Sequence, residues 1–210
     1  MTSTDRLTRL RQTYDQLAKD WGNDPQRHDW GLEELEMFAS KIKESGGSKV
    51  LDLGCGSGVH SRHLVNAGLD VVGLDLSPKM IEKAKTRVPE ADFIVGDIGE
   101  IPFEDLAFDG VYARASLLHI SKEDLDEVLK NIHKILKENG VLYVAVKEGE
   151  GEREVDEERY GQSIRRFYSF FNDEEMRKHL KEAGFEVEEA RKFVRRENSI
   201  PWLLFLAKKV

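Results

Sequence analysis

The sequence has little cysteine and no long apolar run. Cys55 is the only cysteine among 210 residues, so an internal disulfide is excluded, while this count leaves the redox compartment open. No apolar stretch approaches the roughly 20 residues of a membrane-spanning helix, and the most apolar late segment, residues 200–210, is far shorter. The polar N-terminus lacks the apolar part of a signal peptide, so we expect a cytoplasmic protein.

An excess of basic residues is also missing. The chain carries 40 acidic and 32 basic side chains, which gives a formal net charge of −8. Surfaces that bind nucleic-acid backbones are usually basic, so nucleic acid is not an expected partner. A length of 210 residues without a shift in composition suits a single structural domain. The oligomeric state is left open.

What the sequence does have is a regular alternation of apolar strands and amphipathic helices. We expect strands at residues 49–54, 70–76, 92–97, 108–113 and 140–146, with helices between the first three and before the fifth. Apolar strands in this alternation indicate a parallel sheet that is covered on both faces. The predicted fold is therefore the doubly wound, Rossmann-like α/β class.

Both ends of the chain depart from this alternation. Apolar residues at helical spacing predict two N-terminal helices, which we interpret as a helical cap over residues 1–47 on a main unit of residues 48–210. Residues 148–166 are charged and lack periodicity, which predicts a solvated loop. Two strands at 185–194 and 201–209, joined by a short turn, predict a final antiparallel hairpin.

The first strand runs into a turn with glycines at alternate positions, Gly54, Gly56 and Gly58. Glycine lets the backbone approach a ligand without a Cβ collision. The dinucleotide fingerprint would need a glycine where Val59 stands, and the lysine of a phosphate-binding P-loop is absent. Asp52, two residues before the turn, would repel a pyrophosphate but suits a cationic ligand.

Two further acids, Asp75 and Asp97, end the second and third strands. Because the carboxyl ends of parallel strands meet at one edge of the sheet, we expect Asp52, Asp75 and Asp97 to lie together. Asp75 stands where a carboxylate can accept both hydroxyls of a ribose. Each acid alone could be a helix cap or a solvated turn residue, but their repetition at three strand ends favours a ligand site.

Four segments, "VLDLGCGSG", "VVGLDLSPKMI", "FIVGDI" and "ENGVLYVAV", resemble the ordered motifs of the class I S-adenosylmethionine-dependent methyltransferases. The resemblance covers roughly residues 48–210. It implies a seven-stranded, mostly parallel sheet with a reversed last strand, and S-adenosyl-L-methionine as the cofactor. It also implies a set of cofactor-binding residues: Tyr14, Asp52, Gly54, Gly56, Asp75, Leu76, Asp97, Ile98 and Arg114.

The resemblance further implies a role for each member of this set. Asp75 would bind the ribose, Leu76 and Ile98 would flank the adenine, and Asp97 would accept from its exocyclic amine. The two glycines would pass beside the methionine part. Asp52 and the backbone near Arg114 would meet its ammonium end, and Tyr14 stands where related enzymes often contact the cofactor.

Several family features are absent, and these absences narrow the acceptor. Base-modifying members carry an Asp/Asn-Pro-Pro-aromatic tetrad after the fourth strand, where this chain reads "YARASLLHI". That segment also lacks the cysteine of cytosine C5 enzymes and the acidic ligands of metal-dependent O-methyltransferases. We therefore predict in-line methyl transfer to a small molecule, without a metal, in which alignment of the nucleophile is the main requirement.

Other functions stay open at this point. The acceptor could be a protein or a tRNA, or the chain could bind S-adenosylmethionine without catalysis. A nicotinamide dehydrogenase is a more distant alternative, because Val59 breaks its fingerprint.

The candidate reactive side chains have competing interpretations. His119, just after the fourth strand, could be a base or a substrate contact, or a packing histidine. Cys55 could be a reactive thiol near a helix N-terminus, although packing in the turn is favoured. His60 and His63 are spaced to share a metal, but no third ligand is evident, so we expect a solvated helix face.

Two segments outside the shared motifs are expected to shape the acceptor pocket. The N-terminal helices can fold over the strand ends and exclude water. Arg165 and Arg166, followed by four aromatic residues at positions 167, 168, 170 and 171, could clasp an anionic or aromatic substrate. The alternative for that segment is a charged loop followed by an aromatic strand that enters the core.

Overall fold

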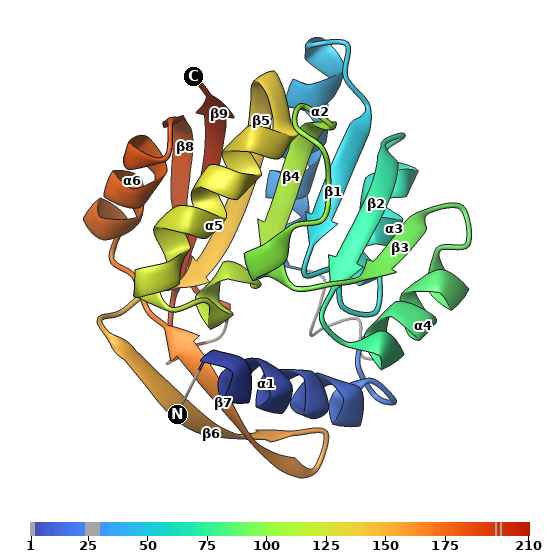
Figure 1. The fold of residues 1–210 in the computed structure, drawn as a ribbon, viewed down its shortest axis with the longest axis vertical. Helices are drawn as coiled ribbons and strands as arrows, with labels where there is room; N and C mark the ends of the chain where they lie inside the picture. Colours follow the sequence, from blue (N-terminus) through green and yellow to red (C-terminus); the bar gives the residue numbers. More distant parts are fainter. Residues whose placement is uncertain (1–2, 24–29, 196, 198) are drawn as a thin grey trace.

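The computed structural model describes residues 3–23, 30–195, 197 and 199–210. Its main sheet has the strand order β3-β2-β1-β4-β5-β9-β8 (Figure 1). The strands of this sheet are β1 (Lys49–Leu53), β2 (Asp70–Asp75), β3 (Asp92–Val95), β4 (Phe108–Arg114), β5 (Leu136–Lys147), β8 (Phe185–Phe193) and β9 (Trp202–Lys209). The helices are α1 (Ser3–Leu17), α2 (Leu32–Glu44), α3 (Val59–Asn66), α4 (Pro78–Arg87), α5 (Lys122–Ile135), α6 (Asp173–Glu182) and two single 3-10 turns, η2 (Ile98–Glu100) and η3 (Leu117–His119).

The sheet is mostly parallel, with one reversed strand. β1 pairs in parallel with β2 and β4, and β4 pairs in parallel with β5. β9 runs antiparallel to both of its neighbours, β5 and β8. The predicted doubly wound sheet with a reversed last strand is therefore confirmed, and the carboxyl ends of β1, β2, β3 and β4 meet at one edge.

Helices cover both faces of the sheet. α2 and α3 bury Phe38 and Leu64 against one face, in a cluster with apolar residues of β1, β4, β5 and β9. α5 and α6 bury Leu129 and Leu180 against the other face. α4 packs beside β3 through a small cluster that includes Cys55 of the glycine turn. These layers fix the strand ends that carry the candidate site.

The two N-terminal helices do different things. Only α1 lies across the carboxyl ends of the strands (Figure 1), where Leu17 and Ala18 pack against Met80 and Ile164. α2 belongs to a helical layer of the sheet instead, so the expectation that both helices cover the strand ends was wrong for α2. Residues 24–29 of the predicted cap lie outside the described residues, and the division at residue 47 stays a prediction.

The charged run at residues 148–166 forms a hairpin, so the prediction of a solvated loop was wrong. β6 (Glu152–Arg159) and β7 (Gln162–Ser169) pair antiparallel and are joined by Tyr160 and Gly161, whose φ values are 51° and 74°. Positive φ at both residues is the geometry of the tightest hairpin turns. Oppositely charged cross-strand partners, such as Asp156 and Arg165, support the pairing. The hairpin projects beside α1 (Figure 1).

Within the described ranges, no helix is long and apolar enough to span a membrane.

Candidate functional site

The glycine turn connects β1 to α3 and forms the floor of the site. Gly54, Gly56 and Gly58 have φ values of 80°, 53° and 74°, a region that L side chains rarely adopt. A Cβ on Gly54 would lie 2.5 Å from the Cβ of Ser116, so the turn also has no room for one there. The turn is held to β2, because the amide N–H groups of Gly54 and Cys55 both donate to the Leu74 carbonyl.

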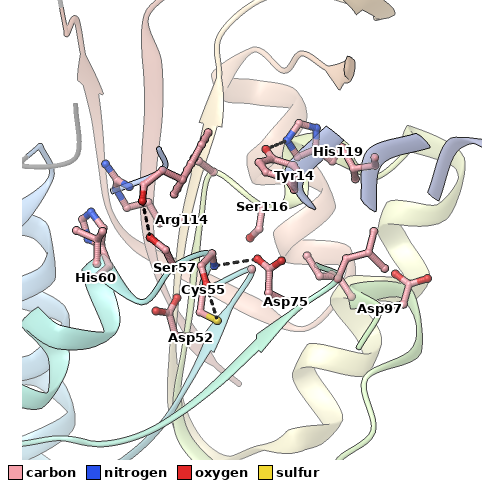
Figure 2. Close-up of a pocket in the computed structure, with 18 of the residues that line it drawn as sticks. Tyr14, Asp52, Cys55, Ser57, His60, Asp75, Asp97, Arg114, Ser116 and His119 are labelled. Atoms are coloured by element: carbon pink, nitrogen blue, oxygen red, sulfur yellow. Dashed lines mark hydrogen bonds between the residues drawn. The ribbon is translucent and has the colours of Figure 1, made fainter. Parts of the chain in front are cut away.

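Above this turn lies a cavity that encloses about 950 Å³ of space not filled by protein, part of it open to solvent. It lies between the strand ends and α1, and Figure 2 shows the side chains that face it. All of the predicted cofactor-binding residues line it: Tyr14, Asp52, Gly54, Gly56, Asp75, Leu76, Asp97, Ile98 and Arg114. His119 lines it as well. The structure thus brings together residues that are up to 105 positions apart in the chain.

Asp75 lies at the end of β2, facing the glycine turn. Its Oδ2 accepts from the amide of Gly56 at 2.8 Å, and its Oδ1 accepts from the amide of Ser77 at 2.9 Å. Burial raises the pKa of the Asp75 carboxyl to about 6, although these two hydrogen bonds favour its charged form. Asp75 is therefore a rigidly held acceptor at the rim of the turn (Figure 2).

Asp52 lies deeper, at the start of the same turn. It is only 3% exposed and accepts from the Ser61 hydroxyl at 2.6 Å. Burial raises the pKa of Asp52 to about 7, against the effect of the Ser61 hydrogen bond and the nearby Arg114. Arg114 itself is held by Trp30, whose ring its guanidinium covers at 3.7 Å and whose carbonyl accepts from Nη2 at 3.3 Å. This end of the cavity combines a buried acid with a fixed cation.

Asp97 serves as a cap and also lines the cavity. Its Oδ1 accepts from the amide of Gly99 at 2.9 Å, which caps the short helix η2. The helix-cap interpretation is therefore correct for Asp97, and it does not exclude the ligand interpretation because Oδ2 is not used in the cap. Leu76 and Ile98 line the cavity beside Asp75 and Asp97 and supply apolar surface between the two acids.

The sequence reasoning missed two residues just after β4. Ala115 has a φ of 58°, a strained conformation for a residue with a side chain, and it lines the cavity. Ser116 is 4% exposed, and its hydroxyl is buried with no hydrogen-bond partner among the described residues. An unsatisfied buried hydroxyl is costly, so its position at the cavity suggests that a ligand atom completes it. Neither residue could be identified from the sequence, because Ala and Ser are common residue types that form no motif here.

His119 is part of a buried chain of hydrogen bonds. Its Nδ1 lies 2.8 Å from the Phe167 carbonyl, which can only accept, so Nδ1 carries the proton. Its Nε2 therefore accepts from the Tyr14 hydroxyl at 2.8 Å (Figure 2). Arg166 Nη1 donates to the same Tyr14 oxygen at 2.8 Å. Burial, with the nearby charge of Arg166, lowers the pKa of His119 to about 3, so the ring is neutral at physiological pH.

The two arginines of the predicted substrate clasp point in opposite directions. Arg166 is 4% exposed and donates to Glu157 at 2.8 Å as well as to Tyr14. Arg165 points to the other face of the hairpin, pairs with Asp156 at 2.6 Å and is not among the residues that line this cavity. The aromatic residues that follow enter the core, as the alternative interpretation of this segment expected: Tyr168, Phe170 and Phe171 are all buried.

The remaining candidates have structural roles. Cys55 packs against Ile81 and Phe93, and burial raises the pKa of its thiol well above the usual range, which confirms a packing residue. His60 is 6% exposed and stacks on Tyr112, so the expectation of a solvated helix face was wrong for it. Over the described part of the chain, no group of three His, Cys, Asp or Glu residues is placed to hold a metal ion.

The residues present fit an adenosyl cation better than a phosphate group. The turn leaves backbone exposed where a Cβ on Gly56 would meet only Trp21, at 3.4 Å. Three carboxylates, Asp52, Asp75 and Asp97, line the cavity together with one arginine, Arg114. The buried Ser116 hydroxyl has no hydrogen-bond partner among the described residues. Apolar side chains of α1, Leu7 and Leu10, close the cavity from the opposite side and exclude water.

Comparison with known proteins finds methyltransferases among the relatives of this chain. Residues 50–140 match the profile of the methyltransferase domain family. An uncharacterized methyltransferase of Synechocystis is 35% identical over 121 residues, which cover 58% of this chain and 54% of the relative. The 27-O-demethylrifamycin SV methyltransferase of Amycolatopsis mediterranei is 30% identical over 166 residues, 74% of this chain and 60% of the relative.

A solved structure shares the whole fold. The 1,6-didemethyltoxoflavin-N1-methyltransferase of Burkholderia thailandensis, with its substrate and S-adenosylhomocysteine bound, superposes with a TM-score of 0.76 at 22% identity. The match covers 100% of this chain and 91% of that one. By contrast, this chain spans only about half the length of the Synechocystis relative.

Proposed function

We propose that the protein is an S-adenosylmethionine-dependent methyltransferase with a small-molecule acceptor, on the premise that its residues 50–140 match the methyltransferase domain family. One observation carries this proposal. The glycine turn and the three strand-end carboxylates, Asp52, Asp75 and Asp97, face a single cavity that α1 covers. A cavity with this charge suits a ligand that is cationic at one end and carries a ribose and an adenine.

The chain offers each part of the cofactor a matching group. Asp75 would accept the ribose hydroxyls, because its carboxylate is fixed by two backbone amides at the rim of the turn. Leu76 and Ile98 would hold the adenine between them, within reach of Asp97. Asp52 would meet the ammonium end. Ser116 would gain the hydrogen-bond partner that its buried hydroxyl lacks among the described residues.

When bound, the cofactor supplies an electrophilic methyl group. The task of the chain is then to align an acceptor atom with that methyl and to exclude water, and alignment alone can correspond to effective molarities of about 10⁵ M or more. α1 excludes water by covering the cavity with Leu7, Leu10 and Tyr14.

We assign His119 a positioning role rather than that of a base. Its Nε2 is occupied by the Tyr14 hydroxyl, and its pKa of about 3 makes it a weak proton acceptor. Together with Arg166 it holds the Tyr14 ring over the cavity. This arrangement suits an acceptor that arrives already ionised, because such an acceptor has no proton to lose.

Substitution of Asp75 tests the proposal directly. Asp75→Ala should weaken the affinity for S-adenosylhomocysteine by about tenfold or more, because two hydrogen bonds to a charged acceptor are lost. Isothermal titration calorimetry measures this change. Asp70→Ala is the matched control, since Asp70 is exposed at the other end of the same strand. Equal affinities in the wild type and in Asp75→Ala would refute the ribose assignment.

The main alternative keeps the fold but changes the acceptor to a protein or a tRNA. Transfer of labelled methyl groups from the cofactor into a cell extract, followed by separation by size, distinguishes the two. Label in the small-molecule fraction supports our proposal, and label confined to macromolecules contradicts it.

A further inference from the structure

A second chamber adjoins the cofactor cavity. It encloses about 560 Å³, part of it open to solvent, and it shares Tyr14, Trp21, Arg114, Ala115 and His119 with the first cavity. Because the two spaces share these five lining residues, a molecule in the second chamber would lie next to the first cavity, beside the Tyr14–His119 pair.

The second chamber is strongly cationic, although the protein is acidic overall. Arg114, Lys147, Arg159, Arg166 and Arg195 all line it, and among the described residues no Asp or Glu does. The chain as a whole has a formal net charge of −8. Five cations gathered at one cavity of an acidic protein indicate a site for an anion.

Among the described residues, one carboxylate, that of Glu157, lies within 4.0 Å of three of these cations. Glu157 lies 2.8 Å from Arg166, 3.0 Å from Arg159 and 4.0 Å from Lys147. One negative charge cannot neutralise three positive ones. In addition, Nε of the buried Arg166 has no hydrogen-bond partner among the described residues. The cluster therefore retains both positive charge and a free donor.

Burial makes this excess positive charge costly. It lowers the pKa of Lys147 to about 8, with the neighbouring arginines acting in the same direction. The ammonium lies 3.8 Å from the centre of the Tyr168 ring, which offsets part of that cost. An anion that entered the chamber would stabilise the charged lysine directly.

Several aromatic side chains line the chamber. Trp21, Tyr160 and Trp202 line it from three separate segments, and each side chain is half-buried. Tyr160 sits at the hairpin tip with a φ of 51°, a strained conformation that brings it to the chamber next to Arg159. Half-buried rings around a cavity offer faces and edges to another ring.

We propose that this second chamber binds the methyl acceptor, and that the acceptor is a small aromatic carboxylate. Lys147, Arg159 and Arg166 hold the carboxylate, and Trp21, Tyr160 and Trp202 pack against the ring. The inference rests on the proposed methyltransferase function and adds a substrate class to it. A carboxylate oxygen would take the methyl group as its bond to the sulfur of the cofactor breaks, which would give a methyl ester and S-adenosylhomocysteine. No proton has to be removed in this transfer, which agrees with the absence of a free base at His119.

Calorimetric titration of three acid and amide pairs tests the proposal. The probes are benzoate, 4-hydroxybenzoate and indole-3-carboxylate, each compared with its neutral amide, in protein saturated with S-adenosylhomocysteine. At least one acid should bind about tenfold more tightly than its amide, because only the acid forms charge-assisted hydrogen bonds. The titrations are repeated without S-adenosylhomocysteine, so that the chamber is tested separately from the cofactor cavity.

Substitutions in the second chamber then test whether the preference for the acid over its amide arises there. Lys147→Gln and Arg159→Gln should each reduce the preference for the acid about tenfold and leave S-adenosylhomocysteine binding unchanged, since neither residue lines the first cavity. Arg165→Gln is the matched control, because Arg165 neighbours Arg166 in the chain but lines neither the cofactor cavity nor the second chamber. Arg159 is partly exposed on the hairpin, so Arg159→Gln should fold normally. It therefore tests the chamber even if Lys147→Gln does not fold.

The outcomes separate the two proposals. Equal affinities of all three acids and their amides, or a preference that survives both substitutions, would overturn the aromatic-acid assignment while the cofactor site stands. Failure of the wild type to bind S-adenosylhomocysteine would instead overturn the proposed function.

Discussion

At the scale of single residues, Gly54 is the position where the glycine turn tolerates least change. Gly54→Ala should lower the free energy of unfolding by about 1–3 kcal/mol, since the residue has a φ of 80° and an added Cβ would lie 2.5 Å from Ser116. Equilibrium urea denaturation measures the loss. Gly46→Ala separates the two causes, because Gly46 has a φ of 77° with nothing within 4 Å. Equal losses in both variants would show that the close approach of Ser116 does not matter.

The two acids of the turn predict a pH dependence of cofactor binding. Burial holds the pKa of Asp52 at about 7 and that of Asp75 at about 6, so both carboxyls gain protons as the pH falls through this range. The ionised Asp52 attracts the cationic end of the cofactor, and the ionised Asp75 is the stronger hydrogen-bond acceptor for the ribose. The affinity for S-adenosylmethionine should therefore fall about tenfold from about pH 8 to about pH 5.5. Calorimetry over this range measures it, and Asp52→Asn should flatten the upper part. An affinity that does not change with pH would contradict the assignment.

The residues that the sequence identified correctly share one property. Asp52, Asp75 and Asp97 are acids at strand ends, and the fold class alone brings such positions to one edge. Nothing in the sequence distinguishes Ser116 and Ala115 from other small residues. Their importance is visible only in the structure, in the buried hydroxyl of Ser116 and the positive φ of Ala115. Arg165 and Arg166 are chemically identical neighbours, and only the strand register decided which of them faces inward.

At the scale of elements, α1 is fastened to the start of α4. Asp15 accepts from the Ser77 hydroxyl at 2.6 Å and from the Lys79 amide at 3.3 Å. Asp15→Ala should loosen α1 over the cavity and speed the dissociation of S-adenosylhomocysteine about fivefold, the equivalent of about 1 kcal/mol for the lost hydrogen bonds. Surface plasmon resonance measures the rate. Gln12→Ala, exposed on the same helix, is the control, and an unchanged rate in Asp15→Ala would mean that α1 does not retain the ligand.

The hairpin of β6 and β7 could not be predicted from hydrophobic periodicity. β6 reads "EREVDEER", and most of its residues are exposed, because the hairpin is a two-stranded ribbon that lies outside the main sheet. Strand prediction depends on a buried face that alternates with an exposed one, and here cross-strand charge pairs replace that face. The complementary acids and bases around Tyr160 and Gly161 were the only available signal.

At the scale of the whole molecule, ligand binding should stabilise the fold. S-adenosylhomocysteine at 100 times its dissociation constant should add about 2.7 kcal/mol to the free energy of unfolding. In a domain of this size, that gain corresponds to a rise of about 5–10 °C in melting temperature. Differential scanning calorimetry measures the shift. NADH in place of S-adenosylhomocysteine should give none, and a comparable shift with NADH would revive the dehydrogenase alternative.

The main sheet was predictable because each of its parallel strands is a short apolar run next to an amphipathic helix. The order of the strands follows from the fold class that this alternation indicates. The position of α2 was not predictable, since its apolar stripe of Leu35, Phe38 and Ile42 shows that it packs but not against which surface.

The place of β9 has a consequence for how the protein is made. β9 follows both β5 and β8 in the chain, yet it lies between them and pairs with each. While a ribosome is still producing the residues after β5, the edge of β5 has no neighbour, and β8 emerges without one. The apolar edge of β5 therefore stays open in the nascent chain until β9 arrives, and one insertion pairs both strands. An open apolar edge favours aggregation during that interval.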